Sequence, residues 1–474
     1  MTPDPTAAVK TYTYSGTATL DTFFGAIKFI GGYRRIRSFS ANDLEGSPFA
    51  VHQSTGVQRL SQASGELQIT GKAFSDLIDF AAGAFYFHEK GVDASVRGTS
   101  IPTLNAITNE FSGSIDNDSS GLYGQANWHI SDRLTFTGGL RYSVDDKGLT
   151  TRNTSFNRTT GILTCSVPTA SVAAGCALTR NDDFAGVSYL AGLDYKIADD
   201  VLVYAKTSKG FRSGGQNLRA NTVASALPFR PEIAYAYEGG IKSEFFDRRV
   251  RLNLAGYYSE INDIQRSTLV GFANGTTSTI LSNAGKLRVY GLESDLAVRL
   301  FEGFEFGATG AVTNPKYLRY AEVPSRTNLT GDRRSERIEN IPKYQFSLSA
   351  NYDRDLGFAR IALNADYSWT SAYALQSYVA FLGDPQGVTI DPFNGKTVSR
   401  NIIDATTSPK QGVLSARAAL TFMDRQLEIA IYGRNLTNNR KRVSALYVAG
   451  INYVSETLRE PRAYGMTATY RFGH

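Results

Sequence analysis

The alternation of apolar and polar residues between Leu122 and Asp145 is the feature that most restricts how this chain can fold. A period of two residues is that of a β-strand, whose successive side chains point to opposite faces. The pattern breaks once, at Ser131-Asp132-Arg133, and then resumes, as expected of an antiparallel hairpin. Each strand is about as long as the ~9–11 residues of a tilted membrane strand. The predicted apolar face comprises Leu122, Ala126, Trp128, Ile130, Leu134, Phe136, Leu140, Tyr142 and Val144.

Further hairpins of this kind follow along the chain. Their short turns contain Asp, Gly or Arg, as tight turns commonly do, and are predicted at residues 247–249, 302–303, 353–355 and 423–425. In bacterial outer-membrane barrels the short turns are periplasmic and the long loops extracellular. We therefore predict an all-β, antiparallel transmembrane β-barrel with that sidedness. The long polar segments predicted as loops lie at roughly 38–55, 91–118, 146–182, 212–231, 264–285, 320–341, 372–410 and 437–461.

The number of predicted strands is odd. The alternating segments give about 17 strands, from near Thr11 to Phe472. Single-chain bacterial barrels have an even number of strands, and they close because unpaired strand edges are not tolerated in hydrocarbon. Residues 1–5 also lack the basic start and apolar core of a signal peptide. We therefore expect residues 1–474 to form the C-terminal part of one barrel domain, whose signal peptide and first strands are missing here.

Composition argues against several other classes of protein. The longest apolar runs, such as Phe80–Phe87, are far shorter than the ~18 residues that a transmembrane helix needs. The net charge is +6, but the basic residues are spread along the chain, whereas nucleic-acid binding needs a clustered basic face. The motifs GxSxG, HExxH and the P-loop are absent. His52, His88, His129 and His474 have no metal-ligand spacing. We expect no enzymatic activity, no cofactor and no metal site.

The two cysteines, Cys165 and Cys176, lie in one polar segment rich in Thr and Ala. An exported protein meets an oxidising compartment, in which such a pair forms a disulfide. A disulfide is therefore the preferred interpretation, with free thiols second and a metal site last.

Four motifs occur in order along the predicted strands. They are residues 203–217 (VYAKTSKGFRSGGQN), 237–246 (YEGGIKSEFF), 290–293 (YGLE) and 435–438 (NLTN). In this order they resemble the motifs of the TonB-dependent outer-membrane receptors, and the resemblance covers most of the 474 residues. That family has 22 strands closed around an N-terminal plug domain, which follows a segment that contacts TonB. The resemblance therefore implies that the plug and about five strands are absent from this sequence.

The last predicted strand adds to the resemblance. Tyr470 and Phe472 end an alternating segment, which is similar to the C-terminal signal that barrel-assembly machinery reads. Here Gly473-His474 extends past the aromatic residue, a small departure from that pattern. The partners implied by the resemblance are this machinery, outer-membrane lipid and lipopolysaccharide, and the TonB energy-transducing complex, reached through the absent N-terminal segment.

The resemblance implies active uptake of a scarce ligand across the outer membrane of a Gram-negative bacterium. A ferric siderophore is the default ligand because it is the commonest in the family. Uptake of a vitamin, a glycan or an aromatic compound remains an alternative; haem is less favoured because only His52 lies plainly in a predicted loop. A passive porin-like channel and a truncated, non-transporting fragment are the other two interpretations.

Charged residues on the polar faces of the predicted strands are expected to face the barrel lumen. They pair with neighbouring strands, with water or with the missing plug, or else some of them line the path of the ligand. A 22-stranded lumen is too wide for side chains to fill. The set comprises Arg141, Asp194, Lys196, Glu238, Lys242, Glu244, Glu293, Asp295, Arg299, Asp366, Arg417 and Arg434.

Two predicted loops are candidates for ligand contact. In 372–410 the aromatic faces and polar groups suit a ligand, or else anchor the loop at the outer interface. In 320–341 guanidinium groups suit a carboxylate, or a phosphate such as that of lipopolysaccharide, or else pair with acids of the same loop. The candidates are Tyr373, Gln376, Tyr378 and Phe381 in the first loop and Arg333, Arg334 and Arg337 in the second.

Overall fold

The computed structural model describes residues 5–43, 52–99, 107–223, 225–271, 277–320, 334, 337–376, 389–390, 397–398, 400–422, 426–448 and 453–472. The chain divides into two compact units. Unit 1 comprises Met1–Gly192, Thr207–Tyr235 and Ile261–Lys286, and unit 2 comprises Leu193–Lys206, Ala236–Glu260 and Leu287–His474.

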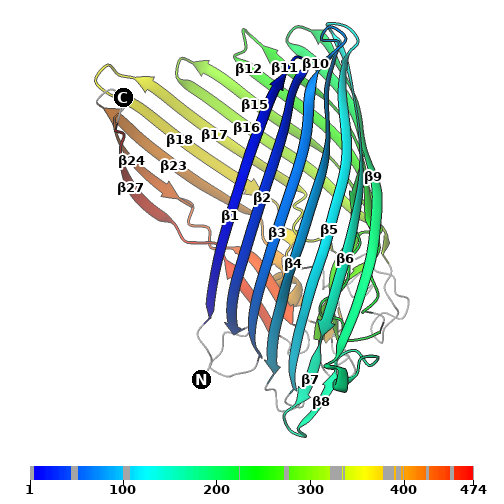
Figure 1. Ribbon diagram of the computed structural model, residues 1–474. Coiled ribbons are helices and arrows are strands. Elements are labelled where there is room, and N and C mark those ends of the chain that lie inside the picture. Colours follow the sequence, from blue (N-terminus) through cyan, green and yellow to red (C-terminus); the bar gives the residue numbers. More distant parts are fainter. Residues whose placement is uncertain are drawn as a thin grey trace. The chain divides into compact units, whose positions relative to one another are not determined.

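Unit 1 consists mainly of long antiparallel strands that pair with their neighbours in chain order (Figure 1). Its loop-end elements are the strands β7 (Thr154–Asn157), β8 (Ile162–Cys165), β13 (Gln265–Gly271) and β14 (Thr277–Asn283) and the short helix η1 (Val172–Ala174). The long strands are β1 (Thr6–Thr22), β2 (Gly25–Asp43), β3 (His52–Ala73), β4 (Ile78–Thr99), β5 (Ile107–His129), β6 (Leu134–Arg152) and the first part of β9 (Ala177–Ala198).

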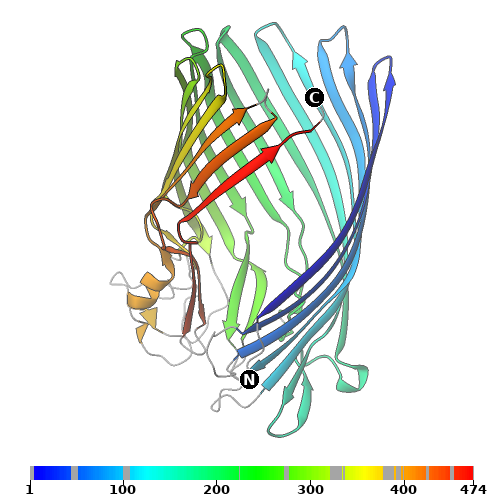
Figure 2. The ribbon, with the colours of Figure 1, turned by 90° about the vertical axis from the view of Figure 1, so that its left-hand side faces the viewer.

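Unit 2 has the same antiparallel design, with β16 to β18, β23, β24 and β27 as successive neighbours (Figure 2). These strands are β16 (Phe304–Tyr320), β17 (Tyr344–Asp355), β18 (Arg360–Thr370), β23 (Gln411–Phe422), β24 (Leu427–Arg434) and β27 (Ala463–Tyr470). Besides β9, the strands that contribute residues to both units are β10 (Val201–Arg212), β11 (Glu232–Phe245), β12 (Val250–Asn262) and β15 (Gly285–Phe301). The short elements are β19 (Tyr373–Ala374), β20 (Thr389–Ile390), β21 (Thr397–Val398), α1 (Arg400–Ala405), β22 (Thr407–Ser408), β25 (Arg442–Val448) and β26 (Tyr453–Leu458).

The strand count agrees with the prediction. Within the described residues the largest sheet has 19 strands. Two of these, β7 and β8, have only four residues each and belong to a loop hairpin, so 17 long strands remain. The predicted all-β, antiparallel class is therefore confirmed. In the described part of the chain, no helix is long and apolar enough to cross a membrane.

The strands extend further than the sequence indicated. Segments 38–55 and 91–118 were predicted as loops, but β2 continues to Asp43 and β4 pairs with β5 as far as Gly98↔Thr108. These outer parts keep the ladder hydrogen bonds of a strand although their residues are polar, because strand pairing does not depend on a lipid environment. The turn predicted at 353–355 was also wrong: these residues belong to β17, and the turn contains Gly357, whose φ is +87°.

Each strand has two distinct faces. Leu122 pairs in register with Tyr142, while Tyr123 pairs with Arg141, so that each face continues from one strand to the next. Leu122 and Leu140 are 65% and 64% exposed, which places them on an outer surface and not in a packed core. We call the face that bears these residues the apolar face and the opposite one the polar face. The strand ends joined by short turns are called the turn end, and the others the loop end.

Candidate functional site

The polar face of unit 1 carries a ladder of hydrogen-bonded side chains. Near the middle of the strands, Tyr123 donates to Glu66 and accepts from Gln68 at 3.0 Å. Further toward the loop end, Glu89 accepts from Gln62 at 2.6 Å and from Asn117 at 3.3 Å. The carboxylates on this face therefore have partners on neighbouring strands, as expected of a polar lumen wall.

The predicted lumen residue Arg141 belongs to the same face. Its guanidinium lies 5.6 Å from the centroid of the Phe85 ring and 5.7 Å from that of Tyr123, and its Nε donates to Ser143 Oγ at 3.0 Å. Aromatic faces attract a cation in this geometry. Arg141 is thus held by three neighbouring side chains, which fixes its position on the polar face.

Segment 213–230 is anchored to the loop end of unit 1 by buried amides. Asn153, only 2% exposed, donates to the carbonyl oxygens of Leu218 at 2.7 Å and Ala220 at 3.0 Å. The buried Gln265 donates to the carbonyl oxygens of Ser213 at 2.9 Å and Arg230 at 3.1 Å. Ala220 is itself buried, so its carbonyl oxygen would otherwise lack a partner, and the four hydrogen bonds together fix the course of the segment.

The cysteine segment packs against this anchored segment. Cys165 and Cys176 form a disulfide with a Cα–Cα separation of 5.3 Å. Between them in sequence, Val167 joins a small buried cluster with Ala220 and Ala226. A loop crosslinked in this way has little conformational freedom to lose when a ligand binds beside it.

A cavity of about 370 Å³ lies between segment 213–230 and the polar face of unit 1. Gln216 spans it, donating to the Lys147 carbonyl oxygen at 3.1 Å and to the Asp182 carboxylate at 2.5 Å. The lining is mixed, with apolar side chains on several strands and polar groups from β3 to β6. The polar side chains that line it include Gln58, Asp93, Asn117, Lys147, Arg212 and Gln216.

A second hollow of about 270 Å³ shares Gln58 and Asp93 with the first. These two side chains are hydrogen-bonded to each other at 3.4 Å. Arg97 and Arg219 line the second hollow. Burial, together with the charge of Arg219, lowers the pKa of Arg97, near the loop end of β4, to about 10. Two guanidinium groups close together in a partly buried hollow favour an anionic ligand.

On the polar face of unit 2, several of the predicted lumen residues form pairs. Glu238 accepts from Tyr204 Oη at 2.7 Å and lies 3.0 Å from Lys206 Nζ, while Lys242 Nζ lies 5.5 Å from the centre of the Tyr204 ring. Asp295 accepts from Asn253 at 3.4 Å.

Four more of the predicted lumen residues of unit 2 lie on β15, β18, β23 and β24. Arg417 donates to Glu428 at 2.6 Å, and the Arg434 guanidinium lies 5.3 Å from the centroid of the Tyr432 ring. Glu293 is in β15, and Asp366 pairs in register with Ser349 and Ser415. Within unit 2 the structure thus brings Glu238 and Lys242 together around Tyr204 and keeps Arg417 with its own partner. A role of any of these residues in ligand passage stays a prediction.

The predicted contact loops are described only in part, because Arg333, Tyr378 and Phe381 lie outside the described residues. Tyr373 begins β19, and Gln376 follows this strand. Arg334 is exposed, whereas Arg337 is half-buried and donates to Thr407 Oγ1 at 2.7 Å. Burial lowers the pKa of Arg337. The contact of Arg337 with Thr407 holds two loop segments together, and ligand binding by this loop stays a prediction.

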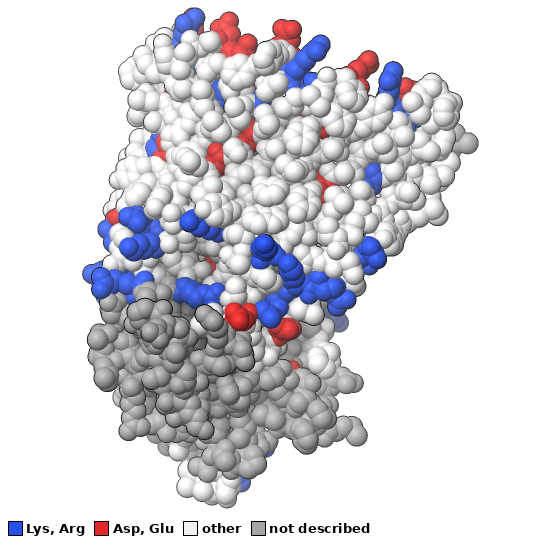
Figure 3. Space-filling model, turned by 180° about the vertical axis from the view of Figure 1, so that it is seen from behind, with Lys and Arg blue, Asp and Glu red and all other residues white. Residues whose placement is uncertain are grey.

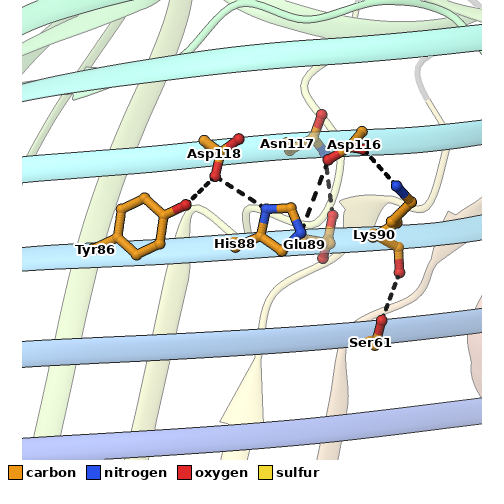
Figure 4. A network of polar contacts seen from close by, with 8 residues as sticks. All are labelled: Ser61, Tyr86, His88, Glu89, Lys90, Asp116, Asn117 and Asp118. Atoms are coloured by element: carbon orange, nitrogen blue, oxygen red, sulfur yellow. Dashed lines mark hydrogen bonds and ion pairs between the residues drawn. The ribbon is translucent and has the colours of Figure 1, made fainter.

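A cluster of acidic and basic side chains on β4 and β5 escaped the sequence analysis (Figure 4). His88 Nδ1 lies 3.0 Å from Asp118, and its Nε2 lies 3.9 Å from Asp116. Their ligand atoms lie within 4.8 Å of one another, a geometry that can hold a metal ion. However, Tyr86 already donates to Asp118 and Lys90 to Asp116, so the protein itself balances these charges. No sequence spacing reveals this cluster, because strand register brings its members together.

The C-terminal aromatic residues lie at the turn end of unit 2. Tyr470 pairs in register with Leu427 on β24, and its ring packs edge to face on that of Phe472, with centroids 4.7 Å apart. Their use as an assembly signal stays a prediction.

The cavity residues Gln58, Lys147 and Arg212 were not among the candidates from the sequence. One signal for them existed, since Arg212 and Gln216 both lie in the motif 203–217. Most of the other lining residues come from β3 to β6, and only strand register brings these strands together beside that motif.

Comparison with known proteins gives a consistent family. A family model described as "TonB dependent receptor-like, beta-barrel" matches residues 3–436. The pesticin receptor of Yersinia pestis is 24% identical over 251 residues, which are 53% of this chain and 32% of the relative. A metal-pseudopaline receptor, CntO, of Pseudomonas aeruginosa is 25% identical over 162 residues, 34% of this chain and 20% of the relative. The chain thus aligns with about a third of the length of the first of these relatives and a fifth of the second.

The fold is shared with a solved structure. The ferric yersiniabactin uptake receptor FyuA of Yersinia pestis superposes with a TM-score of 0.74 at 19% sequence identity. This match covers 99% of the present chain and 62% of that receptor chain.

Proposed function

This chain belongs to the family of TonB-dependent receptors, and from that premise we propose that it serves the active uptake of a ferric siderophore. Barrels of this family lie in the outer membrane of Gram-negative bacteria and are transporters without enzymatic activity. The apolar face is accordingly the lipid-facing side of the wall. The polar face, with its paired charges, is the side on which a ligand passes.

The observation that carries the proposal is the cavity of about 370 Å³ beneath segment 213–230, together with the adjoining hollow. Ferric siderophores hold iron through anionic oxygen atoms, so that the complex presents negative charge. Lys147 and Arg212 line the cavity, and Arg97 and Arg219 line the hollow. Guanidinium groups bind such oxygen atoms through paired hydrogen bonds.

The rigidity of this site supports ligand capture at the loop end. The anchoring by Asn153 and Gln265 and the Cys165–Cys176 disulfide hold the cavity roof in place before a ligand arrives. Binding to a preformed site loses less conformational entropy than binding to loose loops. The names of two relatives, a ferric yersiniabactin receptor and a metal-pseudopaline receptor, support a metal chelate as the ligand class.

Uptake of radioactive iron bound to a panel of siderophores tests the proposal in cells that carry, or lack, the gene. We expect the deletion to abolish uptake of at least one complex, and loss of TonB to have the same effect. Lys147→Gln combined with Arg212→Gln should weaken binding of that complex by about tenfold or more, because charge-assisted hydrogen bonds are lost. The control is Lys28→Gln with Arg133→Gln, which removes the same charge from the turn end.

Two results would contradict the proposal. Unchanged uptake of every ferric siderophore in the deletion strain would shift the assignment to a vitamin, glycan or aromatic ligand. Steady single-channel conductance of the protein in planar bilayers would indicate a passive channel.

A further inference from the structure

Three basic side chains lie side by side on the apolar face of unit 1. Lys10 pairs in register with Arg37, and Arg37 pairs with Arg59, so that one line across β1, β2 and β3 bears three positive charges. Arg35, two residues along β2 from Arg37, projects from the same face. All four side chains are exposed. We call Lys10, Arg35, Arg37 and Arg59 the basic patch.

Like charges placed opposite each other on neighbouring strands destabilise a sheet, since their Cβ atoms are only about 5 Å apart. Elsewhere on the same face the protein relieves such repulsion itself: Lys90 lies 2.9 Å from Asp116, and His88 is bonded to Asp118 (Figure 4). Among the described residues, no acidic side chain forms an ion pair with a member of the basic patch. Within the described residues, the protein thus supplies no ion pair that neutralises the patch.

The position of the patch indicates which anion is present there. Tyr14 and Tyr33, 65% and 44% exposed, lie side by side on the apolar face, and the basic patch begins two residues closer to the loop end. Exposed tyrosines on the lipid-facing side of a barrel mark the membrane interface. A cation just beyond these tyrosines, toward the loop end, lies at the level of the lipid headgroups.

Unit 2, considered by itself, repeats this arrangement. Lys343 Nζ lies 5.3 Å from the ring of the exposed Tyr344, and the Arg462 guanidinium lies 5.7 Å from that of Tyr464. In both pairs the cation is on the loop-end side of the tyrosine. Figure 3 shows a band of Lys and Arg across one face of the molecule, below a surface that is largely uncharged.

We propose that the basic patch binds the phosphate groups of an outer-leaflet lipid headgroup. Guanidinium and ammonium groups are the side chains that pair best with phosphate. The patch is on the lipid-facing side of the wall, so that a phosphate tethered to an acyl chain reaches it without leaving the membrane. A bound headgroup neutralises the three adjacent charges and so strengthens the pairing of β1, β2 and β3.

The test measures binding of a diphosphorylated glucosamine lipid to the purified protein in detergent, by the shift of its melting temperature and by native mass spectrometry. We expect a concentration-dependent rise for this lipid and no rise for the same lipid after enzymatic removal of its phosphates. Arg35→Gln with Arg37→Gln should weaken binding by about tenfold or more. A second variant, Lys10→Gln with Arg59→Gln, should have a comparable effect.

The matched control is Lys28→Gln with Arg34→Gln, which removes two positive charges from the same strand β2 but on its polar face. This variant should bind the lipid as the unchanged protein does. Equal loss of binding in the control would overturn the proposal, since net charge alone would then explain the effect. An equal thermal shift with inorganic phosphate would also overturn it, because the patch would then be a site for free anions. When lipid is absent, the Arg35→Gln/Arg37→Gln variant should have a melting temperature at least as high as that of the unchanged protein. Weaker lipid binding by this variant is then not caused by a loss of folding.

Discussion

The two faces of the same strands in unit 1 handle charge in opposite ways. On the polar face Glu89 receives hydrogen bonds from both neighbouring strands, and Arg141 rests against two aromatic rings. On the apolar face Lys10, Arg37 and Arg59 are aligned without an acidic partner among the described residues. A charge that faces the lumen is thus satisfied by the protein. On the apolar face, Lys90 and Asp116 satisfy each other, whereas the basic patch is left for the membrane to satisfy.

The largest effect is expected where a charge is placed on the apolar face within the membrane. Leu140→Arg should reduce the free energy of unfolding by about 2–4 kcal/mol near the bilayer midplane. Gln125→Arg, on the polar face of the neighbouring strand, is opposite Gly139 and should change it by far less. Denaturant unfolding in lipid vesicles, followed by tryptophan fluorescence, measures both variants. An equal loss for the two would contradict the assignment of faces.

Removal of the disulfide at the loop end of unit 1 should have the next largest effect. Cys165 and Cys176 are 11 residues apart, and a crosslink over a loop of this size contributes about 3 kcal/mol through the entropy of the unfolded chain. Cys165→Ser with Cys176→Ser should therefore expose this segment to proteolysis and weaken ligand capture at the adjacent cavity. Limited proteolysis under oxidising and reducing conditions checks this. Equal cleavage of the variant and the unchanged protein under both conditions would show that the disulfide does not protect this segment.

Asn153→Ala should have the next largest effect and reduce the free energy of unfolding by about 1–3 kcal/mol, because it leaves the carbonyl oxygens of Leu218 and the buried Ala220 without this donor. Hydrogen exchange should increase in segment 213–230 and remain unchanged at the turn end of the strands. Thr160→Ala, in an exposed turn of the same loop region, provides the control. Uniform exchange in all parts of unit 1 would show that the amide supports the whole sheet and not this segment.

The comparison of faces also explains how much the sequence could predict. The hairpin around Ser131-Asp132-Arg133 was predicted correctly because the alternation carries both strand and face. The outer ends of β2, β4 and β5 were not, because their polar residues on both faces look like loop in a sequence. The number of long strands was nevertheless predicted correctly, since lengthening a strand at its loop end does not change the count.

The candidate site was less accessible to sequence reasoning than the fold. Its lining is assembled mainly from β3 to β6 together with segment 213–230, and no local pattern links residues so far apart in the chain. Only the lining residues within the motif 203–217, such as Arg212 and Gln216, could be linked to the site from the sequence. The basic patch has the same origin, because Lys10, Arg37 and Arg59 become neighbours only through register.

The smallest expected effect concerns two neighbouring carboxylates on the apolar face, beyond Tyr86 and Tyr142 toward the loop end. Asp118 and Asp146 pair in register. Hydrogen bonds from Tyr86 and His88 lower the pKa of Asp118 below its usual 3.8, whereas burial and the charge of Asp183 raise that of Asp146. Asp118 therefore stabilises the fold above its ordinary pKa, and this contribution is lost as the pH falls through the lowered value. The contribution of Asp146 to stability has the opposite sign. Its ionised form is disfavoured in the folded protein at neutral pH, and this penalty disappears below its ordinary pKa.

Substitution by asparagine should consequently shift the melting temperature in opposite directions at pH 7. Asp118→Asn should lower it and Asp146→Asn should raise it, both slightly, because solvent screens exposed charges. Both differences should vanish in acid, where the carboxylates are protonated in the folded and unfolded states alike. Asp132→Asn, in the exposed turn, controls for net charge. Shifts of the same sign would show that the two carboxylates respond to the total charge and not to their separate partners. On this part of the apolar face, only Lys90 and Asp116 would then remain as a pair of charges that neutralise each other.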